Sequence, residues 1–408
     1  MTRLHRLLPV LVVVAFAGCG AGGALTMPPA HSAPLVGAAS TENATGLPGE
    51  NATGLPGENA TGLPGENATG LPGTTFSCSP VAASGQARCT LEINVDAGTV
   101  SDPTTPAAAI PGLHPADLVA AYDLPARGAG ATVAIVDAYD DPTAQSDLAV
   151  YRSAFGLPPC DAASGCFRKV NQRGQSGAYP GANAGWSNEI ALDVAMVSAA
   201  CPNCRIVLVE ADSDSMDDLG ASVDEAATFA PLAISNSYYA TEWSSEANED
   251  AHYRHRGISI TASSGDAAAP FYPAASSNVT AVGGTTLTDA GGSWSERAWP
   301  QGGSGCSAYA AKPAWQRAAS CSTRSTVDVA AVADPQTGVA VFSSASGGWI
   351  VAGGTSVGAP LVAAAYALAG NGVGPAYSYG RPWAFSPIGG AGYQQATGLG
   401  SPRGIPGL

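Results

Sequence analysis

The stretch Gly353-Gly-Thr-Ser-Val-Gly-Ala-Pro360 joins an apolar strand candidate, Trp349 to Val351, to a helix of small residues expected from Thr355 to about Ala369. Glycines permit a tight turn and a close backbone approach. The start of a helix offers free N–H groups and positive dipole. Ser356 can therefore turn its hydroxyl toward a substrate carbonyl while nearby N–H groups stabilise an oxyanion. The spacing also fits a Ser or Thr helix cap, and by itself it favours the cap.

Upstream of this turn, apolar β-branched runs alternate with helical patterns. Near-continuous apolar strands between helices are typical of a parallel sheet with helices on both faces. We therefore expect an α/β fold of this kind. Strands are expected at Thr132–Val136, Ile206–Val209, Leu232–Ser237, Ser259–Ala262, Val279–Val282 and Val327–Val332, and helices at Ser187–Ala199, Ser215–Phe229 and Ser244–His255.

A serine nucleophile needs a base, which is usually His, Lys or a carboxylate. None of the five histidines lies in a His-Gly-Thr-His setting, so a histidine-based triad and a neutral subtilisin-type protease are not expected. Glu189 and Asp193 are four residues apart and share one face of a largely apolar helix. Two such acids repel each other and should share a proton at low pH. The alternative, which an isolated pair favours, is that both are solvated near the helix N-terminus.

A third acid, Asp266, closes Ser263-Ser-Gly-Asp266 after an apolar strand. Open parallel sheets bind ligands at the C-terminal ends of their strands. Asp266 is therefore a candidate site residue, although aspartate is also common in turns.

These motifs occur together in one order, and they carry a resemblance from about Pro115 to Pro402. The chain resembles the sedolisin family, the serine-carboxyl peptidases with a subtilisin-like fold. The matching stretches are Val133–Pro142, Glu189–Asp193, Ile234–Tyr238, Ser264–Asp266, Tyr272–Ser277, Val282–Thr286, Asp328–Gly338 and Gly353–Val357.

The resemblance implies roles for these residues. Glu189 and Asp193 would relay charge to the nucleophile Ser356, and Asp266 would be the oxyanion donor in peptide hydrolysis at acidic pH. Extended protein or peptide substrates would pair with the segment from Ser235 to Tyr239. The implied substrate-binding residues are Ser235, Asn236, Ser237, Ser264 and Gly265.

Two departures from the family pattern bear on function. Family members usually carry a long folded propeptide, whereas only a repeat tether and a short segment precede this domain. The family also ends in a calcium loop with Asp ligands, but Ser386, Pro387 and Gln394 stand at those places. Neutral side chains compensate Ca²⁺ poorly, so we expect no calcium and no other cofactor. Both departures favour an alternative hypothesis, a lipid-tethered binding protein that keeps the fold without activity. The intact set of three acids and Ser356 opposes it.

The N-terminus has the pattern of an export signal over residues 1–18. A basic start precedes the apolar run Leu7 to Ala17, which is too short to span a bilayer. Phe16-Ala-Gly-Cys19 resembles a bacterial lipobox, so we expect Cys19 to be lipidated. Ordinary cleavage downstream is the alternative. The chain is thus predicted to be exported, as a cell-surface lipoprotein or an extracellular protein.

The rest of the chain divides into three predicted parts. Residues 19–75 form a flexible tether with four Glu-Asn-Ala-Thr-Gly-Leu-Pro-Gly repeats between Glu42 and Gly73. Residues 76–106 form a short pre-domain segment with a strand around Leu91 to Val95. Residues 107–408 form a single peptidase domain.

Cysteine and charge are consistent with export. Of nine cysteines, Cys19 is set aside for lipid, and eight remain in local pairs that suit disulfides in an oxidising compartment. The pairs are Cys78/Cys89, Cys160/Cys166, Cys201/Cys204 and Cys306/Cys321. Cys201-Pro-Asn-Cys204 also fits a redox or zinc motif. The net charge is -15, which repels nucleic acid and anionic membranes, so we expect neither as a partner beyond the lipid anchor.

Overall fold

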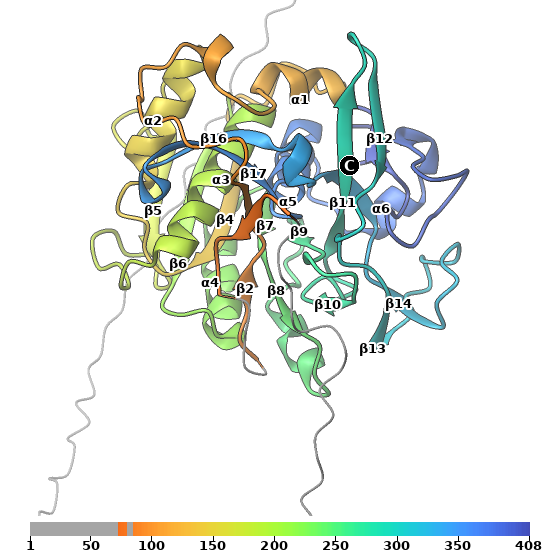
Figure 1. Ribbon diagram of the computed structural model, residues 1–408. Coiled ribbons are helices and arrows are strands. Elements are labelled where there is room, and N and C mark those ends of the chain that lie inside the picture. Colours follow the sequence, from red (N-terminus) through yellow and green to blue (C-terminus); the bar gives the residue numbers. More distant parts are fainter. Residues whose placement is uncertain (1–71, 80–84) are drawn as a thin grey trace, which may run out of the picture. The chain divides into compact units, whose positions relative to one another are not determined.

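The computed structural model describes residues 72–79 and 85–408. The predicted signal peptide, Cys19 and almost all of the repeat tether lie outside the described residues. An eight-stranded sheet forms the centre of the described part (Figure 1). Every pair in it is parallel except β11 with β12. Its strands, in spatial order, are β12 (Trp294–Ala298), β11 (Thr280–Asp289), β9 (Ser259–Ser263), β7 (Ala233–Asn236), β4 (Thr132–Ala138), β6 (Arg205–Ala211) and β5 (Phe167–Asn171), while β15 (Val329–Val332) pairs with β11.

Helices cover both faces of this sheet, which confirms the predicted fold class. Strand side chains alternate, so Val133 and Ile135 of β4 join one core cluster while Ala134 and Val136 join the other. The first cluster includes side chains of α3 and α5, and the second includes those of α4. The α-helices are α1 (Pro115–Ala121), α2 (Ala144–Ala154), α3 (Ala184–Ala200), α4 (Met216–Thr228), α5 (Gly358–Ala369) and α6 (Ala376–Tyr379).

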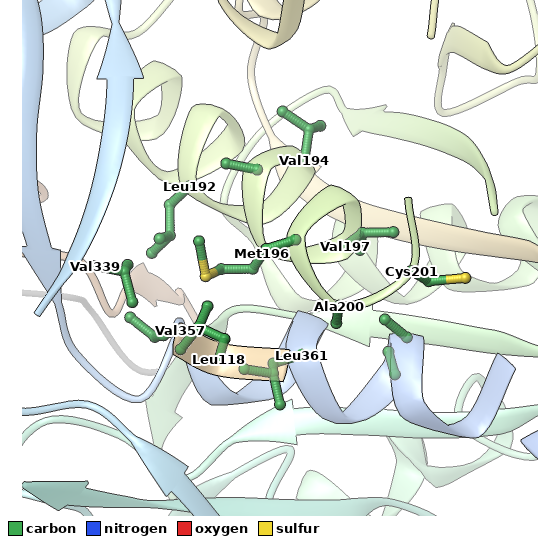
Figure 2. Packing of buried hydrophobic residues seen from close by; sticks show 14 of the residues in the cluster. Leu118, Leu192, Val194, Met196, Val197, Ala200, Cys201, Val339, Val357 and Leu361 are labelled. Carbon is green, nitrogen blue, oxygen red and sulfur yellow. The ribbon is translucent and has the colours of Figure 1, made fainter. Parts of the chain in front are cut away.

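Helix α3 is buried along almost its whole length, and this sets the environment of the two acids on it. Every residue from Trp186 to Ala200 is buried. Figure 2 shows Leu192 and Met196 of α3 close to Val339, Val357 and Leu361, which come from two other parts of the fold. A helix that is apolar all round has no solvated face. Any charged group on α3 is therefore cut off from water.

Two smaller sheets contain the segment before the predicted peptidase domain. One runs β1 (Thr74–Phe76), β3 (Glu92–Asn94), β17 (Gly348–Gly353) and β16 (Val339–Ser343), all antiparallel. The other runs β10 (Phe271–Tyr272), β8 (Tyr238–Thr241) and β2 (Arg88–Cys89). In Figure 1 the orange strand β2 lies beside the green strand β8. Strands β2 and β3 are thus paired with strands from the later part of the chain.

The remaining elements are short. Two hairpin-like pairs join β13 (Cys306–Ala311) to β14 (Thr323–Ser325) and β18 (Phe385–Ser386) to β19 (Ser401–Pro402). The 3-10 helices are Ala107–Ala109, Glu246–Ala251, Pro335–Thr337, Ser344–Ser346 and Pro382–Ala384. Among the described residues, no helix is both long enough and apolar enough to cross a membrane.

Two predicted elements are corrected. The helix expected at Ser244–His255 is only a short 3-10 helix, Glu246–Ala251, in which Glu246 is buried and its carboxylate accepts a hydrogen bond from the Trp243 N–H. The strand expected at Leu232–Ser237 forms as β7, and the chain then enters β8 in a different sheet. Helix α5 begins at Gly358, so Ser356 lies in the turn before it.

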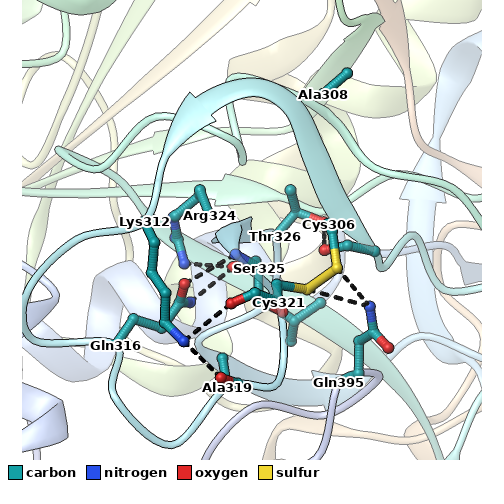
Figure 3. Close-up of a disulfide and its surroundings, with 12 residues drawn as sticks. Cys306, Ala308, Lys312, Gln316, Ala319, Cys321, Arg324, Ser325, Thr326 and Gln395 are labelled. Carbon is teal, nitrogen blue, oxygen red and sulfur yellow. Dashed lines mark hydrogen bonds between the residues drawn. A yellow bond between two sulfur atoms is a disulfide. The ribbon is translucent and has the colours of Figure 1, made fainter.

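Disulfides form at all four predicted pairs, including Cys201–Cys204. Figure 3 shows the Cys306–Cys321 bond and its polar surroundings. The Gln395 amide donates to both sulfurs, and Lys312 donates to the carbonyls of Ala319 and Cys321. The bond therefore closes the loop between β13 and β14, and polar contacts surround it.

Candidate active site

Ser356 lies in the turn between β17 and α5 and is fully buried. The turn needs glycine at position 354, where φ is +96°. A Cβ there would overlap the carbonyl oxygen of Thr90 and crowd Oδ2 of Asp266. Glycine at this position thus allows the turn that carries Ser356 to pack closely against Thr90 and Asp266, which are distant in the sequence.

Glu189 and Asp193 lie on one face of α3, and both are 0% exposed. The alternative that they are solvated at a helix N-terminus is therefore wrong. Asp193 Oδ1 accepts a hydrogen bond of 2.9 Å from the Ser237 hydroxyl. Ser356 lies close enough to Glu189 for its hydroxyl to lower the pKa of that carboxyl. The structure brings the acid pair and the serine together, although 167 residues separate Glu189 from Ser356 in the chain.

The surroundings of the acid pair favour a shared proton over two ionised carboxylates. Burial raises the pKa of Glu189 well above its usual range, and the charge of Asp137 raises it further. For Asp193, burial again has the largest effect on the pKa, followed by the charges of Asp137 and Glu189. Both oxygens of Glu189 and Oδ2 of Asp193 have no hydrogen-bond partner of ordinary geometry in the described part of the chain. Buried oxygens without donors are expected where acids keep or share a proton.

Asp137 is a member of this cluster that sequence reasoning missed. It lies near the end of β4, is 0% exposed, and neither of its oxygens finds a partner among residues 72–79 and 85–408. Burial raises its pKa to about 8. The sequence did offer a signal, because Asp137 is the one carboxylate in the apolar strand Thr-Val-Ala-Ile-Val-Asp-Ala. Burial of an unpaired acid lowers the stability of a fold, so an acid at such a position indicates a functional role.

Asp266 follows β9 and faces the same turn as Ser356. Its Oδ1 accepts two bonds of 2.8 Å, from the backbone N–H and the hydroxyl of Thr355. Its Oδ2 is buried and has no partner among the described residues. Burial raises the pKa of Asp266 well above the usual range, the charge of Glu92 adds to this, and the Thr355 bonds lower it. Because Oδ1 accepts both bonds, a proton on Asp266 would lie on Oδ2.

The expected substrate-binding residues have mixed positions. Ser235 and Asn236 lie on β7 inside the main sheet, and the Asn236 amide donates to the Thr261 carbonyl at 2.9 Å. The Ser237 hydroxyl donates to Asp193, and Ser264 is buried. The Gly265 N–H donates to the Thr355 hydroxyl at 3.1 Å. These residues thus make hydrogen bonds inside the fold around the site. The strand edge that pairs with an extended segment begins one residue later, at Tyr238.

Two more residues at the site come from the segment before the predicted domain. The Thr90 hydroxyl shares a hydrogen bond with the Ser356 hydroxyl, and both residues are fully buried. Glu92 is also buried, which raises its pKa to about 7, and its charge acts on Asp266. The sequence carried no signal for this, because Thr90 and Ser356 are 266 residues apart.

The described residues do not fit a calcium ion at the tail. Ser386 belongs to β18, and the Gln394 side chain donates to the Ala391 carbonyl at 3.4 Å. These groups are neutral, whereas Ca²⁺ is usually held by several carboxylates. Elsewhere in residues 72–79 and 85–408, no three His, Cys, Asp or Glu side chains gather in a way that could hold a metal ion.

The fold and the site together define a class: a subtilisin-like α/β protein whose buried serine is flanked by carboxylic acids. No protein-family model matches the chain. Kumamolisin from Bacillus sp. (strain MN-32) is 29% identical over 354 residues, which cover 71% of this chain and 62% of kumamolisin. The chain thus matches less than two thirds of that relative's length.

Solved structures agree on the fold. Pseudomonas sedolisin, a serine-carboxyl proteinase in complex with pseudo-iodotyrostatin, has a TM-score of 0.63 at 23% identity, covering 72% of this chain and 96% of sedolisin. A protein described as S41 psychrophilic protease has a TM-score of 0.50 at 18% identity, covering 70% of this chain and 96% of that structure. The chain is thus similar in sequence to kumamolisin and shares the fold of Pseudomonas sedolisin, which agrees with the resemblance to the sedolisin family.

Proposed function

We propose that this protein is a serine peptidase that hydrolyses peptide bonds of protein or peptide substrates at acidic pH. The observation that carries the proposal is the buried Ser356 hydroxyl beside Glu189, an acid with a raised pKa, in a sedolisin-like fold. The described histidines offer no other base. His252 and His255 face Asp224 at 2.7 and 3.1 Å, and His114 bonds to the Ile110 carbonyl.

The proposed chemistry is acyl transfer. Glu189 takes the proton of Ser356 as the hydroxyl attacks the substrate carbonyl, and Asp193 shares the charge of the pair. Asp266, protonated at Oδ2, donates to the oxyanion of the tetrahedral intermediate. Glu189 then protonates the leaving amine. Water repeats the sequence and releases the acid product.

The same acids account for the proposed pH range. Asp266 can donate only while protonated, and the Glu189–Asp193 pair needs a proton to return to the leaving group. Raised pKa values extend these protonated forms above the usual carboxyl range. Activity should therefore be highest in mild acid and fall as the proton of Asp266 and the proton shared by the Glu189–Asp193 pair are lost.

We further propose that the chain is exported and needs no calcium. Four disulfides are consistent with an oxidising compartment. The lipobox-like Cys19 supports a lipid anchor, and the acidic charge opposes a nucleic-acid partner.

Digestion of a denatured protein at about pH 4 tests the proposal. Wild type should digest it and Ser356→Ala should not. Ser222→Ala is a matched control, because Ser222 is also a buried serine but lies on α4 and bonds to the Asp218 carbonyl. Equal digestion by wild type and Ser356→Ala would assign the nucleophile elsewhere. Inactivity of all three chains would support the inactive binding protein instead.

A further inference from the structure

A pocket of about 530 Å³ lies at the N-terminal ends of strands β9 and β11. Ile258 and Asn278 line it just before these two parallel strands begin, whereas Asp266 follows β9 at the candidate active site. Helix α5 has 12 residues, a length of about 18 Å, and separates the turn of Ser356 from the pocket wall within residues 372–376. A ligand in this pocket would therefore leave the candidate active site free.

Two arginines line the pocket, and no Asp or Glu does. Within residues 72–79 and 85–408, neither Arg254 nor Arg256 has an ion pair or a side-chain hydrogen bond. His255, which lies between them, is 3.1 Å from Asp224, an acid outside the pocket lining. The chain has 32 Asp and Glu but only 17 Lys and Arg, so two neighbouring arginines without an acid stand out. An anionic ligand would supply the missing negative charge.

A tight turn fixes the backbone that carries Arg256. The Ile258 N–H donates to the His255 carbonyl at 3.2 Å, and Gly257 has a φ of +82°, which suits glycine in a turn. The Gly257 carbonyl packs against Gly372 on the facing wall, where a Cβ would lie 1.6 Å from the oxygen. The two walls are thus held together without a ligand. A preformed site of this kind binds without the cost of ordering its backbone.

Trp315 forms an aromatic wall of the pocket. Its ring centroid is 4.7 Å from that of Tyr379, and the Arg324 guanidinium lies 5.2 Å from the Trp315 ring, so packing holds the indole in place. Ser277 is exposed, and the Asn278 amide nitrogen donates to a backbone carbonyl, which leaves its side-chain oxygen as an acceptor. Pockets of about 300–1,000 Å³ take small molecules. The space therefore suits an anion carried on a hydroxylated ring better than a bare ion.

We propose that this pocket binds a sugar phosphate. Arg254 and Arg256 would hold the phosphate, because the planar guanidinium matches phosphate oxygens with paired N–H donors. The ring would pack on Trp315, and its hydroxyls would bond to Ser277 and Asn278. Phosphate is chosen over carboxylate because of the acidic pH of the proposed function, on which this choice rests. A carboxylate ligand is partly protonated there, whereas a phosphate monoester with a second pKa of about 6 keeps one negative charge.

Calorimetric titration with glucose 6-phosphate at about pH 5 tests the site. The parent protein is full-length Ser356→Ala, which does not digest itself. It should bind at one site, and Arg254→Gln and Arg256→Gln should each weaken binding by about ten- to a hundredfold, the usual effect of a hydrogen bond to a charged group. Arg317→Gln is the matched control and should bind like the parent, because Arg317 is exposed but lies outside the pocket lining. No binding by the parent, or equal affinity in all four chains, would overturn the proposal.

Ligand controls separate the phosphate from the ring. Glucose 6-phosphate should bind at least about tenfold more tightly than inorganic phosphate, glucose or glucuronate. Inorganic phosphate that binds as tightly as glucose 6-phosphate would show a simple ion site and refute the sugar. Glucuronate that binds as tightly, with a carboxylate on the same ring, would refute the choice of phosphate.

Sugar phosphates occur free or within polymers, and one further arm distinguishes these sources. Retention of the parent on phosphocellulose but not on cellulose, lost in the Arg254→Gln/Arg256→Gln double variant, would show that the site accepts a polymer. Binding of glucose 6-phosphate without such retention would assign the site to the free compound. Equal retention of parent and double variant would contradict a role of the pocket in binding the polymer.

These measurements are independent of catalysis. A protein that binds glucose 6-phosphate but digests nothing would refute the proposed function and leave the pocket assignment in place. A wild type that digests denatured protein in acid, while its Ser356→Ala form binds no sugar phosphate, would refute this inference alone.

Discussion

Replacement of Asp137 by Asn should change how the stability of this protein depends on pH. Asp137 is fully buried on β4, and its two oxygens have no partner in the described part of the fold. Burial raises its pKa from 3.8 to about 8. A raised folded pKa means that the folded state holds a proton that the unfolded state releases. The resulting stability is fully present below the unfolded pKa and is lost as pH rises through the folded one.

The size of the effect follows from the pKa difference. One pKa unit corresponds to about 1.4 kcal/mol, so a rise from pH 4 to pH 7 costs wild type up to about 4 kcal/mol through Asp137. Asn has nearly the same shape and does not titrate. The described residues around position 137 offer no hydrogen-bond partner for the Asn amide. Asp137→Asn should therefore be less stable than wild type at pH 4, by about 1–3 kcal/mol. The difference between the chains should then move by about 2–4 kcal/mol in favour of the variant at pH 7.

Urea unfolding measures this difference. Both chains carry Ser356→Ala, which prevents self-digestion, and the free energy of unfolding is obtained by linear extrapolation at pH 4, 5.5 and 7. Removal of the Asp137 charge also lowers the pKa of Glu189 and of Asp193, which moves the difference in the same direction. A free-energy difference that stays constant between pH 4 and pH 7, or that moves in favour of Asp137, would show that Asp137 is ionised in the folded state.

Four further outcomes are expected. Glu189→Gln should lower kcat by about 10²–10⁴, because the amide cannot accept the Ser356 proton. Kinetics with a chromogenic peptide measures this, and a near-normal kcat would exclude Glu189 as the base. Asp266→Asn keeps an N–H donor that does not titrate. In a pH–rate profile the variant should therefore retain a larger fraction of its maximum rate at pH 7 than wild type does. An unchanged profile would exclude Asp266 as the titrating donor. Mass spectrometry of the mature protein should find acylated Cys19, whereas a free N-terminus downstream would leave a simply secreted enzyme. Excess EDTA should leave the melting temperature unchanged, and a large drop would show a metal site that the neutral tail residues do not predict.

Local rules in the sequence were sufficient for the class of fold and for much of the candidate site. Apolar runs alternating with helical patterns predicted the parallel sheet and its covering helices, because periodicity reflects which faces are buried. The spacing of Glu189 and Asp193 placed both on one helix face, and short cysteine separations predicted the four disulfides. These features are encoded within a few residues of each other.

Other features depend on parts of the chain that meet only in the tertiary structure. Whether Glu189 and Asp193 are solvated or buried depends on what surrounds α3, and the residues around it come from several distant segments. The place of Asp137 beside them follows from strand order in the sheet. Thr90 lies against Ser356 because β2 and β3 pair with β8 and β17, which the order of residues along the chain does not indicate. Burial and long-range pairing depend on the whole packed arrangement. The raised pKa values of the acids and the contact between Thr90 and Ser356 are therefore properties of the folded chain.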